Sequence, residues 1–250
     1  MKQLILLFAV LLMVCSCSDE ILNEDNHQAI LGASNVTFSF DSITSNGNWK
    51  LCSFKQKFDA CQIPDSLLSE LTTKELVELC ASHPLNPICY AYNNPMDGAQ
   101  YIMKNFNGFK ELQKREDAAE RLLDFYEGID FIKVTNSPYP ITHEGNNGKF
   151  YSGLNILFIE LVLASGEIPS LYNIINSERL ERVSYSKFEQ KLDKKDTYGM
   201  ISLSNSLIIQ SQVALKTKRL EKNDRRIIQN FYNSCGRFSD ISMVSKILYK

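Results

Sequence analysis

The stretch Leu154-Asn-Ile-Leu-Phe-Ile-Glu-Leu-Val-Leu-Ala164 decides the fold of this chain. Its apolar residues cover almost every face of a helix, which is typical of a helix buried inside a protein. The stretch is shorter than the roughly 20 residues that a transmembrane helix needs, and Glu160 interrupts it. We therefore predict a buried central helix over residues 150–164.

Further helix signals lie outside this stretch. Thr72 and Glu75 have the spacing of a capping box, and Pro84 ends the helix that they start. Residues 115–127 carry apolar residues at helical spacing and are followed by Gly128, a common helix stop. No fixed-period repeat is present, so a regular solenoid is not supported.

Two stretches carry no helix signal. Residues 36–60 begin with the alternating Val36-Thr-Phe-Ser-Phe40 and contain Asn46-Gly47, so we predict an extended segment or a hairpin there. Residues 136–149 are rich in Pro, Asn and Gly and predict a loop. The predicted fold is all-α, an irregular multi-helix bundle or array with a small N-terminal β-hairpin. Its helical halves are residues 61–135 and 150–250.

The first residues predict export. A short start with Lys2 precedes an apolar run of about 11 residues, the pattern of a signal peptide over residues 1–16. Val14-Cys-Ser-Cys17 resembles a bacterial lipobox, because the small Ser16 precedes Cys17, whereas Cys15 follows the bulky Val14. We predict that Cys17 is lipidated and becomes the first mature residue, which anchors the protein to a membrane. The alternative is an ordinary signal peptide.

Residues 17–35 form an acidic segment, with Asp19, Glu20, Glu24 and Asp25 and no Lys or Arg as far as Ile30. The segment resembles the acidic export signal of Bacteroidota lipoproteins, which implies an outer-membrane lipoprotein that faces the exterior. The same composition also predicts a solvated, disordered tether, and both interpretations can hold together.

Several short segments in the first helical half resemble a helical segment of uncharacterised exported proteins of Bacteroidota. They are Ile63-Pro-Asp-Ser-Leu-Leu, Leu76-Val-Glu-Leu-Cys80, His83-Pro-Leu85, Asn105-Phe-Asn-Gly-Phe-Lys-Glu-Leu112 and Arg115-Glu-Asp-Ala-Ala119. They cover less than a third of the mature chain. The resemblance implies an exported helical lipoprotein, and it implies neither an activity nor a catalytic residue.

The charge of the mature chain excludes one class of partner. Loss of Lys2 leaves 26 of the 27 basic residues against 29 acidic ones, a net charge near −3. This balance gives no electrostatic case for nucleic acid binding.

Candidate catalytic and metal-binding residues are sparse. Cys80 or Cys89 with His143 could form a nucleophile pair, but both cysteines lie at apolar helix positions, which favours core packing. Cys80 and His83 make half of a metal site. The chain has no Gly-x-Ser-x-Gly elbow and no phosphate-binding Gly-rich loop. We therefore predict no catalytic, cofactor-binding or metal-binding residue.

The five cysteines after Cys17 leave two interpretations open. Cys52 with Cys61 and Cys80 with Cys89 are the nearest pairs, and an exported chain permits disulfides. Free cysteines on helices behave as small apolar core residues, and the odd count leaves at least one unpaired.

Glu160 is either a functional acid, a satisfied acid at a helix interface or part of an exposed stripe, and the last two are commoner.

The middle of the chain carries aromatic residues that could line a groove for a protein or glycan, although core packing is favoured. They are Tyr90, Tyr92, Tyr101, Phe106 and Phe109. The basic stretch over residues 216–226 is either a binding patch or, as we favour, a solvated helix face.

Asp41-Ser-Ile43 and Asp65-Ser-Leu67 resemble the short motif at which Bacteroidota O-glycosylate exported proteins, which makes Ser42 and Ser66 candidate sites. Asp65 or Ser66 could instead cap a helix.

Together these patterns predict a lipid-anchored, surface-exposed helical binding or interaction protein of the cell envelope. Its partners are the membrane, through the anchor, and a protein or glycan ligand. The sequence favours a binding protein over an enzyme. The alternatives are an extracytoplasmic hydrolase that acts on glycan or peptide, and a structural subunit of an envelope assembly.

Replacing the predicted anchor residue tests the compartment. We expect Cys17→Ala to abolish lipid labelling and to move the protein out of the membrane fraction, because the acyl chains would supply its membrane affinity. Metabolic labelling with a fatty acid and cell fractionation measure both effects. Cys15→Ala is the control, and unchanged labelling of Cys17→Ala would contradict the lipobox.

Overall fold

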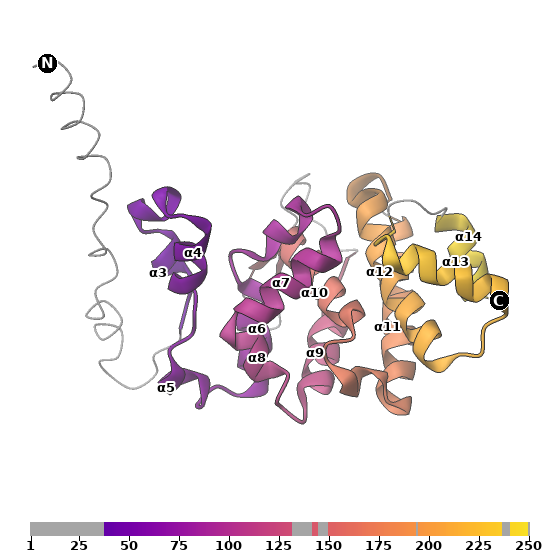
Figure 1. The fold of residues 1–250 in the computed structure, drawn as a ribbon, viewed down its shortest axis with the longest axis horizontal. Helices are drawn as coiled ribbons and strands as arrows, with labels where there is room; N and C mark the ends of the chain where they lie inside the picture. The colour runs from indigo at the N-terminus through magenta and orange to yellow at the C-terminus, as the bar shows by residue number, and fades with distance from the viewer. Residues whose placement is uncertain (1–37, 132–141, 145–149, 194, 237–240, 250) are drawn as a thin grey trace, which may run out of the picture. The chain divides into compact units, whose positions relative to one another are not determined.

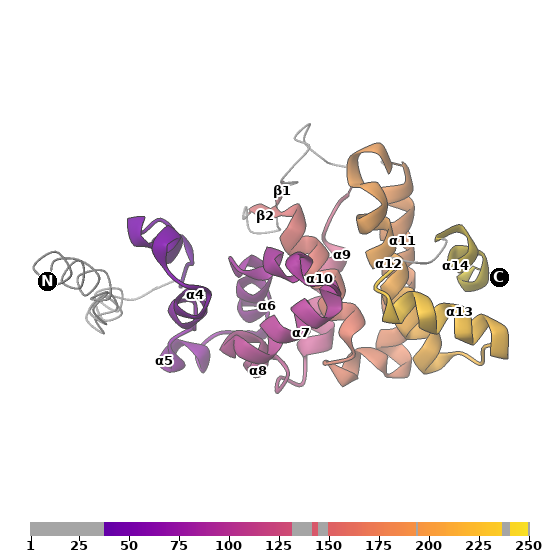
Figure 2. The same ribbon diagram turned by 45° about the horizontal axis from the view of Figure 1, so that its top comes forward.

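The computed structural model describes residues 38–131, 142–144, 150–193, 195–236 and 241–249. The chain divides into two units, Met1–Phe38 and Ser39–Lys250, and the second unit carries every described helix. This unit is all-α except for one short strand pair, which confirms the predicted fold class (Figures 1 and 2). The predicted signal peptide, Cys17 and the acidic segment lie outside the described residues.

Short helices build the first half of the unit. They are α3 (Asp41–Thr44), the 3-10 helix η2 (Gly47–Leu51), α4 (Phe54–Ala60), α5 (Asp65–Leu68), α6 (Thr73–Ser82), the 3-10 helix η3 (Asn86–Ala91), α7 (Pro95–Asn105), α8 (Asn107–Leu112) and α9 (Ala118–Glu127).

Longer helices build the second half, after the strands β1 (Thr142–Glu144) and β2 (Phe150–Ser152). They are α10 (Gly153–Ser165), α11 (Ile174–Asp193), α12 (Lys195–Thr217), α13 (Lys222–Asn233) and α14 (Ile241–Leu248), with the 3-10 helix η4 (Pro169–Tyr172) between α10 and α11.

Helix α10 is the predicted central helix, and its burial confirms the prediction. It contacts α6, α7, η3 and α12. Its buried residues occupy all sides of the helix, as the continuous apolar run requires. They are Ile156, Phe158, Ile159, Glu160, Leu161, Val162, Leu163, Ala164 and Ser165. Among the described residues, no helix is long and apolar enough to cross a membrane.

Helices α11 and α12 lie side by side in both views (Figures 1 and 2). Helix α12 also contacts α10, α13 and α14, so it joins the central helix to the C-terminal helices.

A capping box starts α6 where the sequence predicts one. The Glu75 amide donates to Thr72 Oγ1 over 3.3 Å, and the Thr72 amide donates to Glu75 Oε2 over 2.9 Å. These two bonds give partners to backbone N–H groups that have none within the helix at its start.

The predicted hairpin over residues 36–60 is wrong in its described part, which forms α3, η2 and α4. Neither Asn46 nor Gly47 has the positive φ that a two-residue hairpin turn needs. The Asn46 side chain instead accepts from the Asn48 amide and starts η2. A capping box between Ser53 and Gln56 then starts α4. Local hydrogen bonds to backbone amides therefore favour helices over a hairpin in this segment.

A strand pair lies elsewhere: β1 falls in the segment predicted as a loop, whereas β2 occupies residues 150–152, which were predicted as the start of the second helical half. Strands β1 and β2 pair antiparallel, with His143 opposite Tyr151 (Figure 2). Each strand has three residues, too few for a period of two to stand out in the sequence. The rest of the predicted loop, residues 136–141 and 145–149, lies outside the described residues.

Gly98 tests the close packing of α7 on η3. A Cβ atom at Gly98 would lie 2.6 Å from Cys89 Cα and 2.7 Å from the Cys89 carbonyl oxygen. We expect Gly98→Ala to lower the free energy of unfolding by about 1–3 kcal/mol, because the backbone of η3 must move. Urea denaturation measures the loss. Gly47→Ala is the control, since nothing lies within 4 Å of its Cβ, and equal stability of the two variants would contradict this packing.

Candidate functional site

The acid of the central helix lies in a fully buried polar cluster. Lys191 Nζ of α11 lies 2.5 and 2.7 Å from the two carboxylate oxygens of Glu160, and neither side chain is exposed. Tyr126 of α9 donates its hydroxyl to Glu160 Oε1 over 2.6 Å, and Ser206 of α12 donates over 3.1 Å. Lys191 also donates to the Ser202 carbonyl oxygen. Four helices thus meet at one ion pair.

The surroundings of this cluster favour a structural role. Burial lowers the pKa of Lys191, and the Glu160 carboxylate opposes this shift. The Phe131 ring lies 4.6 Å from Lys191 Nζ and adds a cation–π contact. Glu160 is therefore a satisfied acid at a helix interface, one of the interpretations that the sequence left open.

His83 is a neutral core residue. Its Nδ1 accepts from the Leu85 amide, and its ring lies 4.3 Å from the ring of Phe106. Burial lowers the pKa of His83 to about 3, so the imidazole is uncharged at neutral pH. Among the described residues, no group of three His, Cys, Asp or Glu side chains could hold a metal ion.

The described cysteines after Cys17 are free, and burial makes three of them poor nucleophiles. Burial raises the pKa of Cys61 to about 12, and it also raises the pKa of Cys80 and of Cys89. These thiols are protonated at neutral pH, whereas the thiolate is the reactive form. The core-packing interpretation of Cys80 and Cys89 is thereby confirmed. The side chain of His143, their candidate partner, lies outside the described residues.

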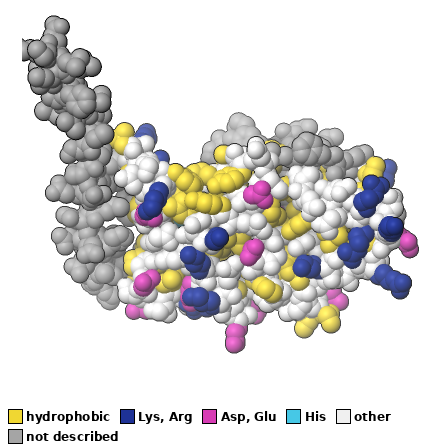
Figure 3. Space-filling view, in the orientation of Figure 1, with side chains coloured by type: hydrophobic (Ala, Val, Ile, Leu, Met, Phe, Trp, Pro, Cys, Tyr) yellow, Lys and Arg dark blue, Asp and Glu magenta, His cyan; other side chains and the backbone are white. Residues whose placement is uncertain are grey.

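The candidate site is an aromatic surface where α4 meets α7. The ring of Phe54 stacks on Tyr101 at 6.1 Å between centroids and 24° between planes, and Tyr92 lies 6.1 Å from Tyr101. Phe54 is 37% exposed and Tyr101 is 41% exposed. We call Phe54, Tyr92 and Tyr101 the aromatic patch. Figure 3 shows hydrophobic side chains gathered between α4 and α7.

Buried rings hold the aromatic patch in place. Phe58 lies beneath it, 5.2 Å from Phe54 and 5.8 Å from Tyr101. Phe58 contacts His83, which in turn contacts Phe106 in the core. A continuous series of rings therefore connects the exposed patch to the interior, and this packing limits the movement of the exposed rings.

The structure separates the five aromatic residues that the sequence grouped. Phe106 and Phe109 are fully buried, and Tyr90 accepts a hydrogen bond from Asn205. Only Tyr92 and Tyr101 join the aromatic patch, with Phe54, which the sequence analysis missed. The spacing of Phe54 and Phe58, one helical turn apart, is the signal that could have found it.

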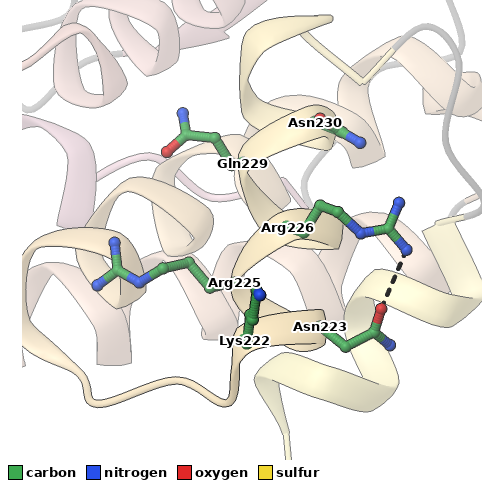
Figure 4. A pocket seen from close by; sticks show the side chains of 6 residues that line it. All are labelled: Lys222, Asn223, Arg225, Arg226, Gln229 and Asn230. Carbon is green, nitrogen blue, oxygen red and sulfur yellow. Dashed lines mark hydrogen bonds between the residues drawn. The ribbon is translucent and has the colours of Figure 1, made fainter.

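A second surface lies on α13. Six of its residues line an open hollow of about 600 Å³ (Figure 4), namely Lys222, Asn223, Arg225, Arg226, Gln229 and Asn230. Arg226 donates to Asn223 Oδ1 over 3.0 Å, and Arg225 donates to the Leu215 carbonyl oxygen over 3.4 Å. In the described part of the chain, neither arginine forms an ion pair with a carboxylate.

The two candidate glycosylation sites are exposed. Ser42 lies in α3 and Ser66 in α5. The residue that caps α5 is Pro64, so neither Asp65 nor Ser66 is its cap. Glycosylation at Ser42 and Ser66 stays a prediction.

Comparison with protein-family models, with curated proteins and with solved structures found no match to this chain.

The buried ion pair gives a stability prediction. We expect Lys191→Met to lower the free energy of unfolding by about 3–5 kcal/mol, because it leaves the Glu160 carboxylate buried without its partner. Glu160→Gln with Lys191→Met removes both charges and should lose clearly less. Lys55→Met, which breaks an exposed pair with Asp59, serves as the control and should change the stability little, because solvent screens exposed ion pairs. Urea denaturation compares the variants, and equal losses for Lys191→Met and Lys55→Met would refute the assigned role.

Proposed function

We propose that this chain is a lipid-anchored interaction protein of the outer membrane, facing the exterior, and that it binds a protein or glycan through the aromatic patch. The lipid at Cys17 would hold the protein at the membrane, and the helical unit would present the patch. The observation that carries the proposal is the exposure of stacked rings on a packed aromatic base.

Exposed aromatic surface needs a reason, because apolar area in water costs about 25 cal/mol per Å² relative to burial. Contiguous exposed apolar groups typically mark an interaction site. Tyr and Phe lose little side-chain entropy on binding, since each has two rotatable bonds, and their rings stack on flat apolar groups. Phe54 and Tyr101 already stack on each other, so part of this ordering precedes any binding.

Binding is favoured over the hydrolase alternative by the state of the candidate catalytic groups. Glu160 is paired with Lys191 in a buried cluster, so it is not available as a general acid or base. Cys80 and Cys89 are buried and protonated at neutral pH. The chemistry that the unit offers to solvent is therefore recognition by surface side chains.

Trp49 gives a direct readout of binding at the aromatic patch. It is the only tryptophan in the chain, and Lys57 of α4 lies 5.6 Å from the centre of its ring. A ligand that docks on α4 and α7 should change the fluorescence of Trp49. The titration uses the mature Cys17→Ala protein with soluble oligosaccharides in one series and with purified envelope proteins in another.

We expect Phe54→Ala with Tyr101→Ala to weaken the binding seen in this titration at least about tenfold, which is the usual loss when anchor aromatics are truncated. Tyr185→Ala is a matched control, because Tyr185 is 42% exposed and lies on α11. Circular dichroism checks that each variant is folded. The same affinity in the double variant and the control would overturn the proposed site.

The same titration separates the remaining possibilities. A ligand found only among envelope proteins, which also copurifies with the chain in fixed proportion, would favour the structural-subunit alternative. Limited proteolysis of intact cells tests the exposed location: protection from the protease would contradict it.

A further inference from the structure

The C-terminal end of α12 and the first half of α13 concentrate positive charge. Residues 216–226 contain six basic and two acidic side chains, whereas the mature chain as a whole has a net charge near −3. Five of the basic side chains are exposed, and we call these five the basic face. They are Lys216, Arg219, Lys222, Arg225 and Arg226. Figure 3 shows Lys and Arg side chains gathered over α13.

The basic face differs from the other arginine sites of the described unit. Arg179 bonds the carboxylates of Asp124 and Glu127, and Arg121 bonds those of Asp117 and Asp124. The basic face has no such ion pair with a described residue. The sixth basic residue of the stretch, Lys218, is the exception and pairs with Glu181. Guanidinium and ammonium donors of the basic face therefore remain available to an external anion.

The shape of the basic face favours an extended partner over a small one. Among the described residues, all those that line the hollow belong to α13, so no other described element closes it. Figure 4 shows Arg225 and Arg226 pointing to different sides of the helix. The amides of Asn223, Gln229 and Asn230 add further hydrogen-bond donors. Such an arrangement suits many phosphate groups spread over a surface.

We infer that the basic face docks the helical unit on the phosphates of anionic lipid headgroups in the membrane that carries its anchor. The inference rests on the proposed function in one respect, that a lipid at Cys17 places the unit beside a bilayer. The 22 residues from Cys17 to Phe38 span at most about 75 Å when fully extended. The anchor would therefore keep the start of the unit within about 75 Å of the membrane surface, and a basic cluster commonly supplies the second contact of a lipid-anchored protein.

Vesicle binding by the unlipidated protein tests the inference. Mature Cys17→Ala protein is sedimented with vesicles of phosphatidylcholine alone and with vesicles that also contain phosphatidylglycerol. We expect binding only to the anionic vesicles, and we expect it to weaken as salt rises, because salt screens the attraction. Equal binding to both kinds of vesicle would overturn the inference, as would no binding to either.

Charge variants locate the contact. Arg225→Glu with Arg226→Glu should weaken binding to anionic vesicles at least about tenfold, and Arg225→Gln with Arg226→Gln should weaken it less, because it adds no repulsion. The control is Lys50→Glu with Lys104→Glu, which makes the same change in net charge at two exposed residues elsewhere. An equal loss in the Lys50 and Lys104 variant would show an effect of net charge alone and would overturn the inference.

Two further readouts separate this inference from the proposed function. Binding of inorganic phosphate and of a soluble acidic polysaccharide is also measured. If either binds but vesicles do not, the basic face is a site for a soluble anion and the membrane contact is refuted. The Trp49 titration should be unchanged in Arg225→Glu with Arg226→Glu. Because the vesicle experiment uses unlipidated protein, its outcome does not depend on the anchor.

Discussion

The ion pair between Glu160 and Lys191 fixes how the central helices meet. A buried charge is stable only when it is paired and hydrogen-bonded, so the position of Lys191 on α11 must match that of Glu160 on α10. Tyr126 and Ser206 extend the same requirement to α9 and α12. Lys187, one turn before Lys191, donates to the carbonyl oxygens of Glu127, the last residue of α9, and of Ile129, which follows that helix. Two buried lysines of α11 therefore set the register of this helix against its neighbours.

The chemical state of the core residues is one reason to propose that the function lies on the surface. The interior uses its titratable groups in neutral or paired form: His83 is uncharged, Cys80 is protonated and Glu160 is paired. The aromatic patch and the basic face use different chemistry, ring stacking in one and charge in the other. If the lipid holds the chain at a bilayer, the basic face would orient the helical unit and the aromatic patch would meet the ligand.

Local signals predicted much of the fold. The capping box of Thr72 and Glu75 starts α6 as predicted, and the apolar run of α10 is buried as predicted. Both features could be predicted because they depend on residues close in sequence. The hairpin over residues 36–60 was wrong because Asn46-Gly47 also suits the start of a helical turn, and the hydrogen bonds that the Asn46 and Ser53 side chains accept favour that alternative. The candidate site was predicted in part: Tyr92 and Tyr101 were named, but among residues that prove to be core.

The sequence by itself determined the helical class and the buried central helix, and it predicts export and a lipid anchor, since each depends on composition or spacing within a short segment. Only the tertiary structure decided that Glu160 pairs with Lys191, that Phe54 stacks on Tyr101 and that the cations of the basic face lack carboxylate partners in the described unit. The physical reason is that each of these facts depends on which side chains meet across helices. A pattern within one helix fixes the face that a residue occupies, but not the partner that it meets there.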